Sequence, residues 1–280
     1  MVTTEIKKIL NEYGVRPNKF LGQHFLVDEN ILRKIIEAAA IKNTDTVLEV
    51  GSGLGILTFE IARRAGKVIA VEKDPVLAEI LKKEIKKRGI TNIEVTIGDI
   101  LKMPIGIFAR ICPYRVIANI PYYLTARLIR KLLEEVPQPK DILFTVQKEV
   151  AERIVSKPPH MNLLALAVQL YGTPKILFTI PKSAFWPAPE VEAAVIKIEN
   201  ISKKIFLDVG VSEPDFFRIV RAAFQTKRKI LLNSLARPTS TDKASLQIIL
   251  ASLGITPSAR PQELDVQQWI SLVARLGKNS

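Results

Sequence analysis

Short apolar runs alternate with amphipathic stretches through the first two thirds of the chain. The first five runs are apolar on both faces, as strands covered by helices on each side require. Between them lie stretches with helical spacing, such as residues 75–88, with Pro75 early and Gly89 after the end. This alternation predicts a doubly wound, mostly parallel α/β sheet. The predicted strands are residues 46–50, 67–71, 93–97, 114–118, 141–146, 175–180 and 193–198.

The pattern changes towards the C-terminus. Residues 181–192 between the last two runs are rich in proline, which predicts a loop rather than a helix and an antiparallel hairpin at one sheet edge. Ser212 with Asp215 resembles a capping box, and apolar residues then recur at helical spacing. We therefore predict an α/β catalytic domain of residues 1–204 and a small all-helical domain of residues 205–280.

Composition limits the class of protein. No run approaches the ~20 apolar residues of a membrane span, and the N-terminus lacks the apolar segment of a signal peptide, so we expect a cytoplasmic protein without membrane partners. The single cysteine, Cys112, excludes an intrachain disulfide and a cysteine-based zinc site. The net charge of +13 favours nucleic acid or another polyanion as partner, although a merely basic soluble protein is the alternative.

Polar residues follow the predicted strands where each strand ends. The first strand ends in a glycine-rich turn, residues 51–55, and the next four lead to Glu72, Asp99, Asn119 and Gln147. Ligands of open α/β sheets bind beyond the carboxyl ends of the strands, so we expect these side chains to converge there. An acid about 20 residues after a glycine turn suits a ribose hydroxyl. The G-x-G-x-G spacing argues against a dinucleotide, and the missing P-loop lysine argues against ATP hydrolysis.

This arrangement resembles the S-adenosylmethionine-dependent methyltransferases, which have a Rossmann-like sheet. The resemblance implies that Gly51 approaches the methionine part of the cofactor, that Glu72 holds the ribose hydroxyls and that Asp99 contacts adenine. Each residue also has a plainer interpretation: the glycine turn as a simple β–α connection, Glu72 as a solvated acid near a helix N-terminus, and Asp99 as a turn residue.

The stretch Asn119-Ile120-Pro121-Tyr122 resembles the signature of enzymes that methylate exocyclic amines of bases. An adenine amine is a poor nucleophile because its lone pair is delocalised into the ring. The Asn119 side-chain oxygen and the Ile120 carbonyl, fixed by Pro121, would accept hydrogen bonds from that amine and direct its lone pair at the methyl group. Tyr122 would stack on the base, which must leave its helix. This reaction needs no metal. A strand-to-helix turn with Thr125 as N-cap is the structural alternative, but it leaves Tyr122 unexplained.

A closer resemblance covers residues 19 to about 235. The chain is similar to the small-subunit rRNA adenine dimethyltransferases of the KsgA type. The resemblance implies that His24 and Leu26 close over the cofactor, that Gly51, Gly53, Glu72, Asp99 and Asn119 complete its site, and that Phe185 sandwiches the target base with Tyr122. Packing beneath the proline-rich loop is the alternative for Phe185. Lys227, Arg228 and Lys229 stand where the family contacts rRNA. The other basic clusters, 82–88 and 127–131, are interpreted as solvated helix faces, with a wider footprint on RNA as the alternative. The segments that carry the likeness are 19–36, 47–58, 119–125, 145–154, 183–198 and 224–235.

The family implies a monomer that transfers methyl groups from S-adenosylmethionine to two adjacent adenosines in the 3′-terminal hairpin of small-subunit (16S) rRNA. Its partner would be that rRNA or the assembling small subunit. A large-subunit (23S) rRNA adenine methyltransferase of the macrolide-resistance type is one alternative. A catalytically silent RNA-binding assembly factor is another, although the intact Asn119, Pro121 and Tyr122 argue against it.

Overall fold

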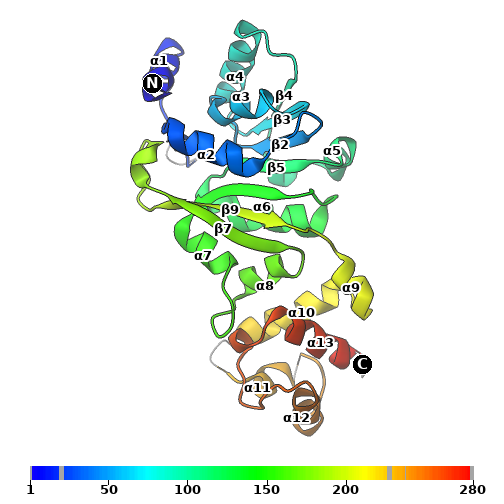
Figure 1. The fold of residues 1–280 in the computed structure, drawn as a ribbon. Coiled ribbons are helices and arrows are strands. Elements are labelled where there is room, and N and C mark those ends of the chain that lie inside the picture. Colours follow the sequence, from blue (N-terminus) through cyan, green and yellow to red (C-terminus); the bar gives the residue numbers. More distant parts are fainter. Residues whose placement is uncertain (1, 19–21, 226–228, 237, 278–280) are drawn as a thin grey trace. The chain divides into compact units, whose positions relative to one another are not determined.

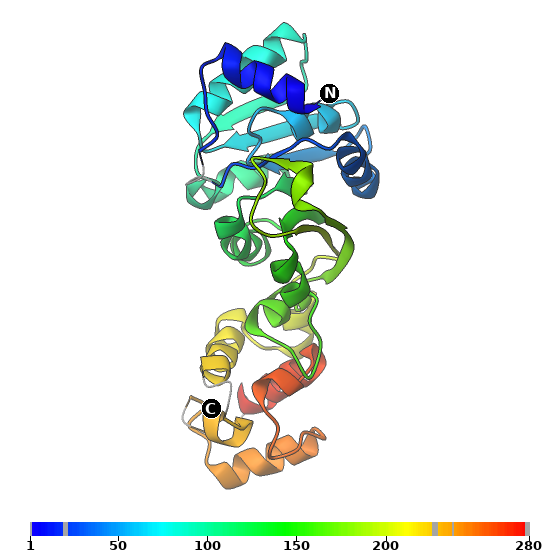
Figure 2. The ribbon, with the colours of Figure 1, turned by 90° about the vertical axis from the view of Figure 1, so that its left-hand side faces the viewer.

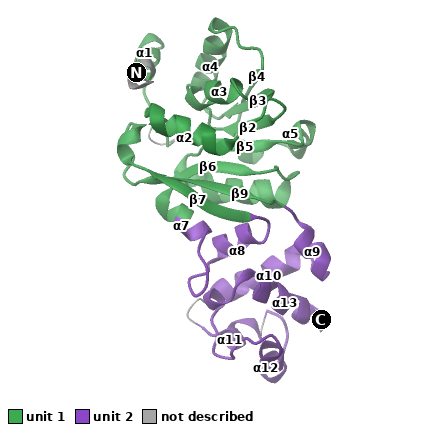
Figure 3. Ribbon diagram, viewed as in Figure 1, with its two compact units in different colours: residues 1–151, 173–201 green, residues 152–172, 202–280 purple. Residues whose placement is uncertain are grey.

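The structure is a computed structural model that describes residues 2–18, 22–225, 229–236 and 238–277. The chain divides into two compact units (Figure 3). Unit 1 comprises Met1–Ala151 and Thr173–Ile201, and unit 2 comprises Glu152–Gly172 and Ser202–Ser280. The sequence pattern predicts a single domain boundary between residues 204 and 205. Unit 2 instead comprises Ser202–Ser280 together with Glu152–Gly172, a segment that the prediction assigned to the α/β domain. The division into two independent domains stays a prediction.

A seven-stranded sheet forms the centre of unit 1 (Figure 1). Its order is β4-β3-β2-β5-β6-β9-β7; the first five of these run parallel, and β9 is antiparallel to both β6 and β7. The predicted parallel sheet and its antiparallel edge hairpin are thus confirmed. The strands are β2 (Thr46–Val50), β3 (Lys67–Glu72), β4 (Ile93–Ile97), β5 (Arg115–Asn119), β6 (Ile142–Gln147), β7 (Thr173–Ile180) and β9 (Ala193–Glu199).

The strand order places a topological switch point beside β2. The chain moves outward from β2 through β3 to β4 and then returns to the other side of β2 as β5. The connections after β2 and β5 therefore lead away in opposite directions, and a crevice opens between their carboxyl ends. This is where the sequence analysis expects a ligand.

Helices cover both faces of the sheet (Figures 1 and 2). Side chains of α2 and α3 pack on Val47, Val68 and Ile117, and the alternate residues Leu48 and Val116 are also buried. The prediction of two buried faces is wrong for β4, whose residues are half-buried or exposed because it is an edge strand with one neighbour. The helices of this part are α1 (Val2–Glu12), α2 (Glu29–Ala39), α3 (Ile56–Ala62), α4 (Pro75–Lys87), η2 (Ile100–Lys102), α5 (Ile105–Ile111), η3 (Tyr122–Leu124), α6 (Thr125–Arg130), η4 (Lys131–Glu135) and α7 (Lys148–Ile154).

The proline-rich segment before β9 is more ordered than the predicted loop. It contains a short 3-10 helix, η5 (Lys182–Ala184), and a two-residue strand, β8 (Phe185–Trp186). Strand β8 pairs antiparallel with β1 (Phe25–Leu26), so that Phe25 is opposite Trp186 and Leu26 is opposite Phe185. This small ladder joins two segments that are far apart in the sequence and brings both to the carboxyl edge of the main sheet.

Unit 2 is helical. The predicted cap before α10 is confirmed: the Ser212 hydroxyl accepts a hydrogen bond from the Asp215 N–H (3.2 Å) and donates one to its carboxylate (2.6 Å). In its core the Tyr171 ring contacts the rings of Phe206 and Phe217. No helix among the described residues is long and apolar enough to cross a membrane. The helices are α8 (Leu163–Gln169), α9 (Lys204–Val209), α10 (Glu213–Gln225), α11 (Leu231–Leu235), α12 (Lys243–Ser252), η6 (Pro261–Glu263) and α13 (Val266–Gly277).

Candidate active site

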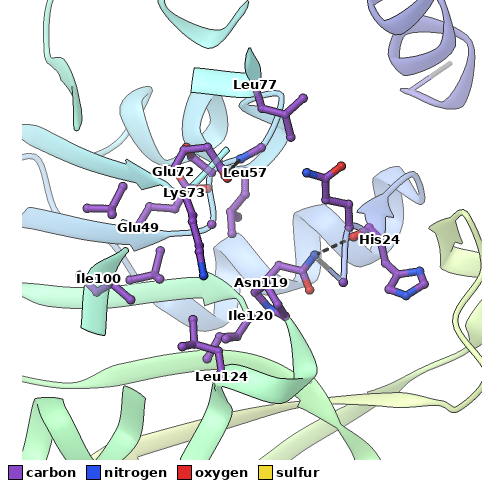
Figure 4. A pocket seen from close by; sticks show the side chains of 18 of the residues that line it. His24, Glu49, Leu57, Glu72, Lys73, Leu77, Ile100, Asn119, Ile120 and Leu124 are labelled. Atoms are coloured by element: carbon purple, nitrogen blue, oxygen red, sulfur yellow. Dashed lines mark hydrogen bonds between the residues drawn. The ribbon is translucent and has the colours of Figure 1, made fainter. Parts of the chain in front are cut away.

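A pocket in unit 1 opens at the carboxyl ends of β2, β3, β4 and β5 (Figure 4). Segment 22–26 and Phe185 close it from the side of the β1–β8 ladder. Gln147, at the end of β6, does not line it, so only four of the five expected strand ends converge. All predicted residues for the cofactor and the target base line this one pocket: His24, Leu26, Gly51, Gly53, Glu72, Asp99, Asn119, Ile120, Pro121, Tyr122 and Phe185.

The glycine turn after β2 forms one wall of the pocket. Gly53 has a φ of +54° and donates its N–H to Glu72 Oε2 at 2.7 Å. Gly55 has a φ of +86°, and a Cβ there would lie 2.5 Å from Leu81 Cδ1. Both positions therefore favour glycine, the first for its backbone conformation and the second also for packing against α4.

Glu72 closes the end of β3 and is 7% exposed. Besides the bond from Gly53, its carboxylate accepts a hydrogen bond from the Asp74 N–H at 2.9 Å. Burial raises the pKa of Glu72, although these backbone bonds oppose the shift. The carboxylate is therefore fixed by main-chain donors and is not a solvated helix-terminal acid. That helix-capping role belongs to Asp74, which accepts from Val76 and Leu77 at the start of α4.

Asp99 lies just beyond β4. One carboxylate oxygen accepts from the Leu101 N–H at 3.0 Å, and the other lies 3.1 Å from Lys73 Nζ. Burial alone would raise the pKa of Asp99, but the Leu101 N–H and the Lys73 ammonium outweigh it and lower the pKa below its ordinary value. Asp99 therefore carries a negative charge at the pocket wall and also caps η2, so its turn role and its pocket position coexist.

The side-chain amide of Asn119 stands at the end of β5. Its Nδ2 donates to the His24 carbonyl at 3.1 Å, a bond that Figure 4 shows as a dashed line. The His24 ring in turn contacts the Pro187 carbonyl through Nδ1 at 2.7 Å. Because an amide nitrogen only donates, this contact assigns Oδ1 as the acceptor that remains for a ligand.

The rings beside Asn119 come from separate segments. Tyr122 is half-buried, and its ring lies parallel to that of His24, with centroids 6.1 Å apart. Phe185 is 4% exposed and packs in a hydrophobic core cluster with residues of α2 and α3 while also lining the pocket. Thr125 is the first residue of α6 rather than its N-cap, because its hydroxyl donates back to the Tyr122 carbonyl at 3.3 Å.

Sequence reasoning missed two features near the pocket. Glu49, in the middle of β2, is 1% exposed, and its Oε2 has no hydrogen-bond partner among the described residues. Burial and then the nearby Glu72 raise its pKa to about 8. An acid inside an otherwise apolar strand was the available signal. Lys131 was interpreted as part of a solvated helix face, which is wrong: it is 6% exposed and donates to the Leu101 and Met103 carbonyls (3.2 and 3.1 Å).

The predicted RNA-binding cluster lies in unit 2. Lys227 and Arg228 are outside the described residues, and Lys229 is exposed after α10. The structure therefore leaves this part of the sequence analysis as a prediction.

The glycine turn, the two acids and the amide-proline-tyrosine segment surround one pocket at the carboxyl edge of the sheet, as the resemblance to S-adenosylmethionine-dependent methyltransferases of exocyclic amines implies. The chain is similar to a ribosomal RNA small subunit methyltransferase A from Dehalococcoides mccartyi, with 41% identity over 98% of this chain and 94% of that protein. A solved dimethyladenosine transferase from Plasmodium falciparum matches with 28% identity and a TM-score of 0.77, over 91% of this chain and 98% of that one. The 23S rRNA methyltransferase ErmE shares the fold, with a TM-score of 0.70 at 24% identity, over 90% of this chain and 99% of that one.

The family model described as ribosomal RNA adenine dimethylase matches residues 14–278. The chain belongs to this family. It is an S-adenosylmethionine-dependent enzyme of the rRNA adenine methyltransferase class.

Proposed function

We propose that this protein transfers methyl groups from S-adenosylmethionine to the exocyclic amines of two adjacent adenosines in the 3′-terminal hairpin of small-subunit (16S) rRNA. The products are dimethyladenosines, and the reaction takes place during biogenesis of the small subunit. The names of the relatives from D. mccartyi and P. falciparum support this substrate. The observation that carries the proposal is the Asn119 amide, whose nitrogen is engaged by His24 so that its oxygen is left to accept from an amine.

The pocket residues fit the methyl donor. Glu72 accepts main-chain donors with both oxygens and would use its remaining lone pairs for two ribose hydroxyls, and Asp99 would accept from the adenine amine. Glu49 Oε2 in β2 and Ser52 Oγ in the glycine turn are buried without partners among the described residues, which is expected where a polar ligand binds. His24, Leu26 and Gly51 complete the enclosure. When bound, the cofactor supplies an electrophilic methyl carbon.

The remaining residues prepare the amine. The Asn119 oxygen and the Ile120 carbonyl accept its two N–H groups, which withdraws the nitrogen lone pair from the ring. Pro121 fixes the Ile120 peptide, and its close approach to Gly22 and Gly51 holds the segment against both walls. Tyr122 and Phe185 exclude water and stack on the base. Alignment of the amine in this way lowers the entropic part of the barrier without a metal.

The rRNA would be bound chiefly through its phosphates. The basic segment Lys227, Arg228 and Lys229 supplies such contacts in unit 2, and these contacts position the RNA without reading its sequence. We further propose that the protein acts as a monomer in the cytoplasm on the assembling small subunit.

A methylation assay on separated, unmethylated ribosomal subunits tests the proposal. With methyl-labelled cofactor we expect label in the small-subunit rRNA and in two adjacent adenosines. Label only in large-subunit rRNA would assign the macrolide-resistance type of activity instead. RNA binding without label in either subunit would identify a silent assembly factor.

A further inference from the structure

The second tyrosine of the signature segment has no role in the reaction proposed above. Tyr122 is half-buried beside His24, whereas its neighbour Tyr123 is 54% exposed at the same pocket. The Tyr123 ring passes close to Gly22, where a Cβ would be 3.8 Å from it. One wall of the pocket mouth thus presents an aromatic ring to solvent.

An uncompensated cation lies one turn further along. Arg127 of α6 is exposed and lines the same pocket, and its guanidinium forms no ion pair or hydrogen bond with any described residue. Neighbouring cations differ in this respect: Lys73 pairs with Asp99 at 3.1 Å, and Arg130 pairs with Glu134 at 2.7 Å. Among the described residues that line the pocket, Arg127 is therefore a cation that remains available to an anion.

Tyr123 lies near Lys73 at the pocket mouth. The pKa of Lys73 is raised first by its hydrogen bond to Asp99 and next by the charge of the Tyr123 phenolate form. Tyr123 and Arg127 are four residues apart across the junction of η3 and α6. An aromatic ring and an unpaired guanidinium at the same pocket mouth are a combination that binds a base and its phosphate in single-stranded RNA.

We propose that Tyr123 and Arg127 form a second nucleotide site at the pocket mouth, which holds the nucleotide adjacent to the one whose base occupies the pocket. Its base stacks on the Tyr123 ring, and the phosphate between the two nucleotides binds the Arg127 guanidinium. This inference rests on the proposed function, since it requires a base to enter the pocket from RNA.

The second nucleotide site would reduce the cost of moving the target base into the pocket. A nucleotide that leaves its helix also unstacks its neighbour, and a protein ring that replaces the lost stacking partner reduces the cost of extrusion. Where the neighbour is itself an adenosine to be methylated, stacking on Tyr123 keeps it next to the pocket for the following reaction.

Steady-state methylation of unmethylated small subunits tests the site with four variants. Tyr123→Ala should raise KM for the subunit about tenfold, the smaller end of the loss for one stacked base. Tyr123→Phe should stay within about twofold of wild type because its ring still stacks. Arg127→Gln should raise KM and lower the salt slope of RNA binding by about one, as loss of one phosphate contact does. Arg130→Gln is the matched control on the same helix and should change neither quantity.

A binding measurement separates this inference from the proposed function. With S-adenosylhomocysteine present, the dinucleoside monophosphate ApA should bind wild type about tenfold more tightly than adenosine. The gain should disappear in Tyr123→Ala and shrink in Arg127→Gln. Equal gains in all variants, or no gain in wild type, would overturn the second site even where methylation is normal. Absence of methylation by wild type would count against the proposed function instead. Melting curves identify an unfolded Tyr123→Ala, in which case Arg127→Gln decides the question.

Discussion

The two halves of the pocket are held in different ways. In the cofactor half, which comprises the turn 51–55, Glu72 and Asp99, each acid is fixed by main-chain N–H groups near strand ends. In the target half, which comprises Asn119, Tyr122 and Phe185, the contacts join distant segments. Asn119 bonds to His24, 95 residues away, and His24 bonds to Pro187, 163 residues away.

This difference predicts that cofactor binding and methyl transfer depend on different residues. The cofactor half is built by the sheet itself and should tolerate changes in the target half. The target half is completed by segment 22–26 and the β8 segment, so its geometry depends on how these segments pack. Substitutions in the two halves should therefore change different measured quantities.

Asn119→Ala should cause the largest loss of activity. It removes the side-chain acceptor for the amine, and we expect kcat to fall roughly 10²- to 10³-fold, as after loss of one catalytic hydrogen-bonding group. The Kd of S-adenosylhomocysteine, measured by calorimetry, should stay within about threefold because the cofactor half is intact. Asn119→Asp keeps an oxygen acceptor and should retain more activity than the alanine variant. A large rise in Kd with unchanged kcat would erase the distinction between the halves.

Gly55→Ala should cause the largest loss of stability. The added methyl group would lie 2.5 Å from Leu81 Cδ1, and the residue has a φ of +86°. Strain and overpacking together should cost about 2–4 kcal/mol of unfolding free energy. Gly89→Ala is the matched control, since Gly89 also has a positive φ (+65°) but nothing within 4 Å of its Cβ position. Similar melting temperatures for the two variants would contradict tight packing at the turn.

Glu72→Gln should weaken cofactor binding more than it slows turnover. Loss of the charged acceptor should raise the Kd of S-adenosylhomocysteine about 10- to 100-fold. At saturating cofactor, kcat should fall much less. Glu94→Gln serves as control, because Glu94 is an exposed residue of β4 that pairs with Lys67 on the neighbouring strand. A Glu72→Gln enzyme with normal Kd would remove this residue from the cofactor half.

Glu49→Gln should show its effect in the pH dependence of stability. The pKa of Glu49 is raised to about 8 in the folded protein. The folded state therefore binds this proton more tightly than the unfolded state, and that stabilisation is complete below pH ~4.5 and is lost as pH rises towards 8. Relative to the Gln variant, wild type should lose about 5 °C in Tm between pH 5 and 8.5. If the Tm of wild type and of Glu49→Gln changed with pH in the same way, Glu49 would not be a buried neutral acid.

The sequence predicted the cofactor half from local signals. A glycine turn and acids after apolar strands follow from the carboxyl-edge rule, and the structure brings Gly51, Glu72 and Asp99 to one pocket. The β1–β8 pairing that positions His24 and Phe185 has no local signal, because two-residue strands carry too little periodicity. These residues were expected only from the family resemblance.

Two charged residues show that the spacing of apolar and polar residues along the chain does not predict the burial of a charged side chain. Glu49 was counted within an apolar strand, and Lys131 within a solvated helix face. The carbonyls of Leu101 and Met103 need a donor that the tertiary fold supplies, so burial of Lys131 could not be inferred from its neighbours in sequence. Buried charge is decided by contacts between segments, and helical spacing gives only the face.

The most direct test is mass spectrometry of adenosines from unmethylated small-subunit rRNA incubated, within the small subunit, with the enzyme and S-adenosylmethionine. The account predicts dimethyladenosine at two neighbouring positions with wild type and a near-complete absence of it with Asn119→Ala. Full dimethylation by Asn119→Ala, with its cofactor affinity unchanged, would contradict the role of the amide in preparing the amine.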